Sequence, residues 1–173
     1  MRFFFLAFVS LFLLSGCGGG LENYVSPLVR AGHQIDYITV DKSDRILSIW
    51  EKGRVIKHYR IMAMGLDPIG HKTTEGDEKT PEGLYTIDRK HKSQKYQYFL
   101  HISYPNANDV ARARARGVSA GGHVGIHGFE SGYKGERRKR YYDWTDGCIA
   151  VTSRESKELF DLIRAGTPIK IRP

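Results

Sequence analysis

Alternation of apolar and polar residues over short stretches constrains the fold of this chain more than any other feature. Residues 45–65, RILSIWEKGRVIKHYRIMAMG, place β-branched and aromatic residues on both sides of Glu51-Lys52-Gly53, which is typical of a β-hairpin. Residues 34–41, QIDYITVD, predict a strand that is at least partly buried on both faces. Further short strands are expected at 84–88, 96–105 and 167–173.

Two short helices are expected among the strands. Residues 108–117, NDVARARARG, are rich in alanine and arginine, with Asn108 as the expected N-cap. Thr152 and Glu155 have the T-x-x-E spacing of a capping box and precede an apolar helical face. The length of 173 residues suits one domain with a core. The prediction is a mainly β, β-rich α+β domain over 34–173.

The N-terminal residues have a different character. The stretch MRFFFLAFVSLFLLSGC has Arg2, an apolar run and then small residues, and the run is shorter than the roughly 20 residues of a transmembrane helix. Its ending, LLSGC, resembles a bacterial lipobox. This resemblance implies that 1–16 are a signal peptide and that Cys17 is lipidated. Residues 17–33, with three glycines at the start, are expected to be the lipidated N-terminus and a flexible tether. An ordinary signal peptide with an incidental cysteine is the alternative.

Cysteine usage points to chemistry at Cys148. The chain has two cysteines, and in an exported protein two cysteines normally suggest a disulfide. A lipidated Cys17 leaves Cys148 without a partner. Because an unpaired thiol is a liability in an oxidising compartment, we expect Cys148 to be used as a nucleophile.

Charge and export together limit the partners. The formal net charge is +8, which in a cytosolic protein would suggest nucleic acid. Export excludes that class, so the membrane, an anionic wall polymer or peptide carboxylates are the expected partners. The basic run Arg137–Arg140 is either a binding loop or a solvated one. Gly18 follows Cys17 where an aspartate would resemble an inner-membrane retention signal. In a double-membraned bacterium we therefore expect the protein at the periplasmic face of the outer membrane.

His127 is the histidine expected to activate the thiol. His101 alternates within a strand and is expected to be a core histidine. His123 and His127 lie among four glycines in 121–128, which excludes a helix. In a strand their imidazoles would be roughly 13 Å apart, so no metal is expected, and no cofactor. The other histidines are expected to be structural or solvated: His33, His58, His71 and His91.

The segment around Cys148 completes the expected site. His127 ends one strand and Cys148 starts the next, and the polar loop between them is expected to cover a groove. Gly147 permits a tight turn, in which the backbone N–H groups of Gly147 and Cys148 are candidates for an oxyanion site.

The motifs IHG at 126–128 and TDGCIAV at 145–151 resemble the H-G…[S/T]-x-G-C-[IV] signature of the YkuD-type L,D-transpeptidase catalytic domain family. The resemblance covers residues 35 to 173 and implies a mixed β-sandwich with short helices. Other segments similar to the family are EGDEKTPEGLYTI at 75–87, HISYPNANDVARA at 101–113 and TSRESKELFDLI at 152–163.

The resemblance implies a reaction and roles for individual residues. Cys148 would attack the carbonyl that joins the third residue of a peptidoglycan stem peptide to its terminal D-alanine, with His127 as general base. A thioester forms, and an amine or water resolves it. Gly147, Gly128 and Thr145 fall on the signature and are expected in oxyanion or substrate binding. The implied role is in cell wall biogenesis and cell shape.

The chain departs from the family pattern at two positions. Ala150 stands where many members have Arg or Asn, and Asp146 where many have a basic residue. The expected replacements in substrate binding are Tyr142, Trp144 and the basic run Arg137–Arg140, which includes the candidate Arg138. Asp146 itself is also expected at the substrate-binding site.

Other functions stay open at this point. One is a hydrolase of the same fold, either an L,D-carboxypeptidase or an amidase that releases wall-bound lipoprotein. Another is a non-catalytic wall-binding lipoprotein, although the presence of both His127 and Cys148 argues against it. An unrelated cysteine peptidase would need an Asn or Asp that orients the histidine, and the sequence identifies none.

Overall fold

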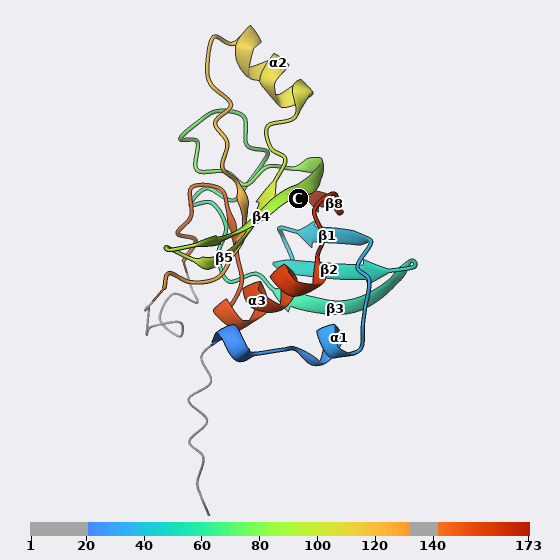
Figure 1. Ribbon diagram of the computed structural model, residues 1–173. Helices are drawn as coiled ribbons and strands as arrows, with labels where there is room; N and C mark the ends of the chain where they lie inside the picture. Colours follow the sequence, from blue (N-terminus) through green and yellow to red (C-terminus); the bar gives the residue numbers. More distant parts are fainter. Residues whose placement is uncertain (1–20, 132–141) are drawn as a thin grey trace, which may run out of the picture.

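The structure is a computed structural model that describes residues 21–131 and 142–173 (Figure 1). Two residues with predicted roles, Cys17 and Arg138, lie outside the described residues together with the rest of the basic run. In the described ranges no helix is long and apolar enough to cross a bilayer.

Eight strands form one curled sheet, so the predicted strand-rich fold is confirmed. The sheet order is β3-β2-β1-β8-β4-β5-β6-β7, and its neighbours are antiparallel except for the parallel pairs β1–β8 and β6–β7. The short helices lie around this sheet (Figure 1). The strands are β1 (Tyr37–Asp41), β2 (Ile46–Glu51), β3 (Arg54–Arg60), β4 (Gly83–Ser93), β5 (Gln97–Ile102), β6 (Gly125–His127), β7 (Ile149–Ala150) and β8 (Pro168–Arg172).

The predicted hairpin is formed by β2 and β3. Its loop is Lys52-Gly53, with φ of 50° and 74°, and Glu51 belongs to β2, where it pairs with Arg54. Positive φ at both loop residues matches the twist of the flanking strands, which explains the glycine. The turn is therefore one residue shorter than the sequence predicts.

The helices are α1 (Pro27–Arg30), α2 (Ala107–Ala115) and α3 (Ser153–Leu162), with a 3-10 turn η1 (Leu21–Asn23) before them. The capping box of Thr152 and Glu155 is confirmed at the start of α3. The predicted cap of α2 is wrong by two residues. Asn106 is the N-cap, because its side chain accepts from the backbone N–H groups of Asn108 and Asp109 and Asp109 bonds back to it.

The N-terminal described segment packs on the domain. Leu28 and Val29 contact the core, Ser26 is fully buried, and the Arg154 guanidinium of α3 lies 4.1 Å from the centre of the Tyr24 ring. Apolar contacts of this kind hold a chain segment in place. From Leu21 onward the segment for which a flexible tether is expected is therefore folded onto α3.

The sheet and α3 enclose the apolar core. Fully buried members include Ile38, Leu47, Ile126 and Leu159, and α3 packs against β5 and β6. The core thus supports the edge of the sheet where β6 and β7 end.

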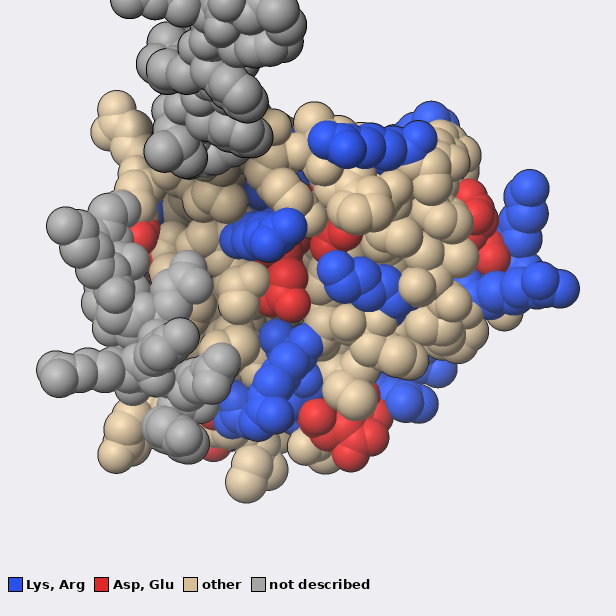
Figure 2. Space-filling model, turned by 90° about the horizontal axis from the view of Figure 1, so that it is seen from below, with Lys and Arg blue, Asp and Glu red and all other residues tan. Residues whose placement is uncertain are grey.

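On the face seen from below, basic side chains alternate with acidic ones and do not form one continuous basic area (Figure 2).

Candidate active site

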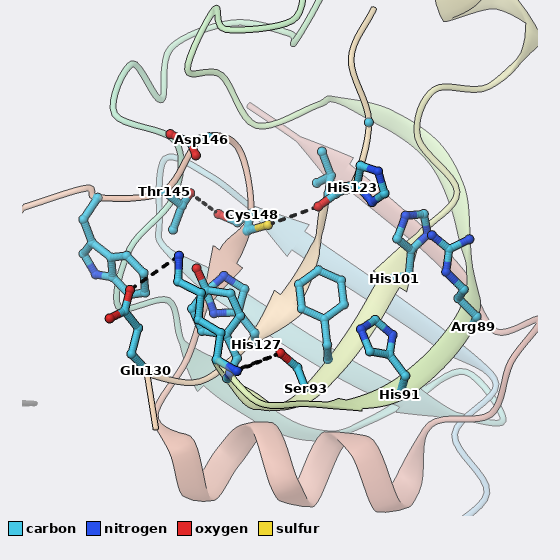
Figure 3. Close-up of a pocket in the computed structure, with 16 residues that line it drawn as sticks. Arg89, His91, Ser93, His101, His123, His127, Glu130, Thr145, Asp146 and Cys148 are labelled. Atoms are coloured by element: carbon cyan, nitrogen blue, oxygen red, sulfur yellow. Dashed lines mark hydrogen bonds and ion pairs between the residues drawn. The ribbon is translucent and has the colours of Figure 1, made fainter. Parts of the chain in front are cut away.

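The parallel pairing of β6 and β7 brings the predicted nucleophile and base together. His127 is the register partner of Ala150, and Cys148 precedes Ala150 by two residues. Cys148 directly precedes β7, so the chain enters the strand with the Cys148 side chain near the face on which the His127 side chain lies. Both line a cavity of about 460 Å³ (Figure 3).

The His127 imidazole is held in one tautomer. Its Nδ1 lies 2.7 Å from the Gly128 carbonyl, which can only accept, so Nδ1 carries the proton and Nε2 has the free lone pair. Nε2 is buried and has no hydrogen-bond partner among the described residues. Burial lowers the pKa of His127 to about 4, against an opposing effect of the Gly128 bond. The ring is thus a neutral base with its acceptor nitrogen unused.

Aromatic rings enclose His127. The Tyr96 ring stacks on the imidazole at 3.8 Å between centroids, and the Phe99 ring lies 5.8 Å away and nearly parallel. The Trp144 ring is 5.7 Å from His127. These contacts fix the ring and exclude water from it, which is the cause of its low pKa.

The Cys148 side chain is partly buried, and its thiol is hydrogen-bonded to the backbone. Its Sγ donates to the His123 carbonyl at 3.6 Å. His123 has a φ of 56°, a left-handed conformation that is uncommon for a residue other than glycine. Burial of the thiol, with a further contribution from the Asp146 charge, raises the pKa of Cys148 to about 11. At neutral pH the free protein therefore holds a neutral thiol beside a neutral imidazole.

The turn before Cys148 is built by Thr145 and Gly147. The Thr145 hydroxyl donates to the Cys148 carbonyl at 2.7 Å and accepts from the Gly147 N–H at 3.2 Å. Gly147 has a φ of 132°, and a Cβ there would lie 2.6 Å from the Lys79 carbonyl oxygen. Thr145 therefore shapes the turn, and the Gly147 N–H, one of the two expected oxyanion donors, already has an acceptor in this structure.

Asp143 ties this turn to the rest of the sheet. Its carboxylate accepts two hydrogen bonds from the Arg45 guanidinium, at 2.9 and 2.5 Å, and one from the Met64 N–H at 2.7 Å. A bidentate pair of this kind fixes orientation as well as distance. No local sequence pattern indicates this role, since Arg45 and Asp143 are 98 positions apart.

The remaining predicted site residues fall into two groups. Trp144 and Asp146 line the cavity, whereas Tyr142 is 76% exposed and does not. The Gly128 carbonyl accepts the hydrogen bond of His127. Gly128 also allows close packing on α3, because a Cβ there would lie 2.7 Å from the Ser153 Cα. Ala150 is fully buried and its N–H and carbonyl both bond to the 62–63 backbone.

Sequence reasoning missed the β4–β5 side of the cavity. Tyr96 and Phe99 surround the base, and nothing in a tyrosine-rich strand pattern marks them. His101, expected in the core, is buried and bonds Asp88, yet it also lines the cavity. Across the described ranges, no three His, Cys, Asp or Glu side chains are grouped as metal ligands.

Known proteins share this architecture. The chain is similar to "Putative L,D-transpeptidase YafK" of Escherichia coli (strain K12), with 28% identity over 134 residues, 73% of this chain and 46% of the relative. It is similar to the helical cell shape determining protein Pgp2 from Campylobacter jejuni, with 26% identity and a TM-score of 0.62 over 80% of this chain and 47% of that one.

A third likeness, to an Enterococcus faecium L,D-transpeptidase C442S mutant, concerns the fold alone: 21% identity and a TM-score of 0.51 over 80% of this chain and 50% of that one. The chain spans about half the length of these relatives. The sequence profile of the YkuD L,D-transpeptidase catalytic domain matches residues 35–171. The chain therefore belongs to the L,D-transpeptidase catalytic domain family.

Proposed function

We propose that the protein is a cysteine-dependent L,D-transpeptidase that acts on peptidoglycan stem peptides through a thioester on Cys148. The observation that carries the proposal is the shared cavity of Cys148 and His127, in which His127 Nε2 is buried with no hydrogen-bond partner in the described part of the chain. A nucleophile beside a base that a third group orients is the usual arrangement for covalent acyl transfer. Here the orienting group is the Gly128 carbonyl.

The proposed reaction begins with a proton transfer. The Cys148 Sγ–H proton passes to His127 Nε2 while sulfur bonds to the carbonyl carbon before the terminal D-alanine. The C–N bond then breaks, and the imidazolium protonates the departing amine. An acceptor amine next gives its proton to Nε2 and attacks the thioester, which restores the Cys148 thiol and forms a new amide.

Because the free thiol has a pKa of about 11 and the imidazole one of about 4, the pair is not ionised before substrate arrives. We therefore propose that the proton transfer and the attack are coupled. Bound substrate expels water from the cavity and supplies the carbonyl that receives the electron pair.

Mass spectrometry of the intact protein tests this function. The full chain in detergent is mixed with a disaccharide tetrapeptide, with Cys148→Ala alongside. We expect an adduct on Cys148 whose mass reflects loss of D-alanine, and none on the variant. Absence of both adduct and product with every muropeptide offered would leave the non-catalytic wall-binding function instead.

The products separate transferase from hydrolase, since both share the acyl-enzyme. Added acceptor amine, a second stem peptide, should appear in a cross-linked muropeptide. Release of the tripeptide alone, at a rate unaffected by the acceptor, would identify an L,D-carboxypeptidase. Release of a peptide attached through diaminopimelate would identify an amidase.

We propose that the enzyme works as an exported lipoprotein, anchored through Cys17 in the outer membrane and facing the periplasm. The lipobox-like LLSGC supports this. A role in wall remodelling and cell shape is part of the proposal, since Pgp2 is a helical cell shape determining protein. Cell fractionation of Cys17→Ser tests the anchor, because the variant should leave the membrane fraction. Unchanged membrane association would disprove it.

A further inference from the structure

A β-bulge gathers charged groups at one end of the cavity. β4 and β5 pair Ile87 with Ile102 and Arg89 with His101, which leaves Asp88 as an extra residue on β4. Bulges redirect side chains and are common beside active sites. Here the bulge brings two successive residues, Asp88 and Arg89, to the same histidine: Asp88 bonds His101 Nδ1 at 2.6 Å, and Arg89 is the register partner of His101.

Arg89 is the unused member of this group. Its side chain lines the cavity, and its guanidinium makes no hydrogen bond or ion pair with any residue in 21–131 or 142–173. In Figure 3 Arg89 points toward His101 and His123. The His123 ring meets the His101 ring edge-on at 6.3 Å between centroids. Guanidinium groups in such sites usually bind a carboxylate or a phosphate through two parallel hydrogen bonds.

Within 21–131 and 142–173, no carboxylate pairs with Arg89 at this end of the cavity. Of the two acidic residues that line the cavity, Glu130 pairs with Lys95 at 3.6 Å, and Asp146 lies on the other side of Cys148 (Figure 3). Asp146 and Glu75 also line the adjoining hollow that Arg89 shares, but neither carboxylate pairs with Arg89. Asp88 is committed to His101. The Arg89 end is therefore suited to an anion supplied by the substrate.

The Arg89 end also lies next to the nucleophile. The His123 carbonyl accepts a hydrogen bond from the Cys148 thiol, while the His123 ring contacts His101 at the Arg89 end of the cavity. In a peptide, the carbonyl that follows the attacked one is only about one residue length, ~3.8 Å, farther along the chain. The carboxylate that directly follows the scissile bond is thus within reach of a group beside His123.

We propose that Arg89, together with the His123 imidazole, binds the free carboxylate of the terminal amino acid of the donor stem peptide. This inference rests on the proposed function and deepens it. It makes Arg89 a specificity-determining residue: donors that end in a free D-amino acid are preferred over donors in which that carboxyl group is an amide.

Paired donors test the subsite. The full chain in detergent is given a tetrapeptide that ends in D-alanine or its D-alaninamide counterpart, and kcat/KM is measured for each. We expect a preference for the acid of roughly tenfold to hundredfold, as for a hydrogen bond to a charged group. In Arg89→Met the ratio should fall toward one. Comparing the same two donors in each protein cancels the difference between the two leaving amines.

Two further variants sharpen the result. Arg54→Met, at the exposed start of β3 and outside the cavity, should keep the wild-type ratio. His123→Asn should lower the ratio partly, since asparagine tolerates the left-handed backbone and retains the carbonyl that holds the thiol. Thermal unfolding of each variant confirms folding.

The outcomes distinguish the subsite from the function. A wild-type ratio near one, or an unchanged ratio in a folded Arg89→Met, overturns the subsite while the reaction stands. If wild type consumes neither donor, the proposed function fails and the subsite fails with it.

Discussion

The imidazole at position 127 and the thiol at position 148 are both neutral when no substrate is present. Burial lowers the pKa of His127 to about 4 and raises that of Cys148 to about 11. Cysteines that react readily at neutral pH lie in electropositive surroundings that lower their pKa. The raised pKa of Cys148 instead keeps the thiol protonated at neutral pH, and a protonated thiol is less susceptible to oxidation than a thiolate.

The reactivity of Cys148 should follow its high pKa. Because only the thiolate reacts, alkylation of Cys148 by iodoacetamide should accelerate about tenfold per pH unit from pH 7 to 10. Peptide mass spectrometry of the Cys148 peptide gives the rate, and a free cysteine control, with a pKa of about 8.5, should level off above pH 9. A rate that is already constant from pH 7 would indicate an ionised pair and contradict the coupled proton transfer.

Burial of His127 should also make the fold sensitive to acid. The unfolded histidine has a pKa of about 6.5, while the folded one is lowered to about 4. The stability contribution is fully present above pH 6.5 and is lost as the pH falls toward 4, because the unfolded state takes up the proton first. The loss should be about 3 kcal/mol, at 1.4 kcal/mol per unit.

Urea unfolding at pH 7 and pH 4 measures this loss. His127→Gln has no proton to gain, so its free energy of unfolding should change less over the same range. All other titrating groups are common to both proteins. Equal acid sensitivity of the two proteins would contradict a buried neutral imidazole at this position.

At this scale the sequence predicts the reacting atoms and little of what surrounds them. Cys148 stands out as the unpaired cysteine, and His127 as a histidine among glycines. Tyr96, which stacks on His127, comes from a different hairpin, and no local pattern connects the two. A β-bulge in β4 directs the Arg89 side chain into the cavity, and the sequence of one strand does not reliably predict a bulge.

The turn from Thr145 to Cys148 is the element on which the site depends most. Gly147 combines a φ of 132° with a position where a Cβ would meet the Lys79 carbonyl at 2.6 Å. Gly147→Ala should therefore carry both a backbone cost and a steric one. The Lys79 carbonyl and the Thr145–Cys148 turn are both held in place. We therefore expect the free energy of unfolding to fall by roughly 3 kcal/mol or more, and the activity to fall strongly.

Gly53→Ala is the matched control for this substitution. Gly53 also has positive φ, at 74°, but a Cβ added at Gly53 would meet no atom within 4 Å. It should lose only the backbone cost of roughly 1–2 kcal/mol. Urea unfolding of both variants compares the two costs. Equal destabilisation would show that the contact with the loop at Lys79 does not constrain the turn.

Elements with strong local signals were predictable. The β2–β3 hairpin and the capping box of α3 follow from residue types that occupy neighbouring positions. The cap of α2 was misplaced because Asn106 and Asn108 offer the same side chain, and only Asp109 at the third helical position selects Asn106. The strand expected to start at Cys148 is found as β7, which begins one residue later and has two residues.

The topology of the whole molecule depends on contacts between distant segments. β8, the last strand, lies between β1 and β4, parallel to β1 and antiparallel to β4. A strand pattern gives no information about its partners, so the sheet order could not be predicted from periodicity. The resemblance to a known family indicates the strand-rich fold with short helices, and the structure shows its strands as one curled sheet. The same limit applies to the site, because β6 and β7 must pair in parallel before Cys148 and His127 share a face.

The N-terminal segment extends the folded unit beyond the region shared with the family. The family match starts at residue 35, but Leu28 and Val29 pack on the core and Tyr24 lies under Arg154. A chain that starts at Ile35 should be less stable than one that starts at Leu21. Two half-buried aliphatic side chains account for about 2 kcal/mol, and the cation–π contact for roughly 0.5–1 kcal/mol more.

Urea unfolding of the two chains measures the difference, and Tyr24→Ala in the longer chain isolates the ring contact. The variant should lose only the smaller contribution. Equal stability of the long and short chains would show that the segment packs on α3 without stabilising the domain, and would restore the full-length tether. If the segment does stabilise the domain and Cys17 carries the proposed lipid, only residues 18–20 separate that lipid from the folded unit. At about 3.5 Å per residue, the enzyme would then work within roughly 15 Å of the membrane surface.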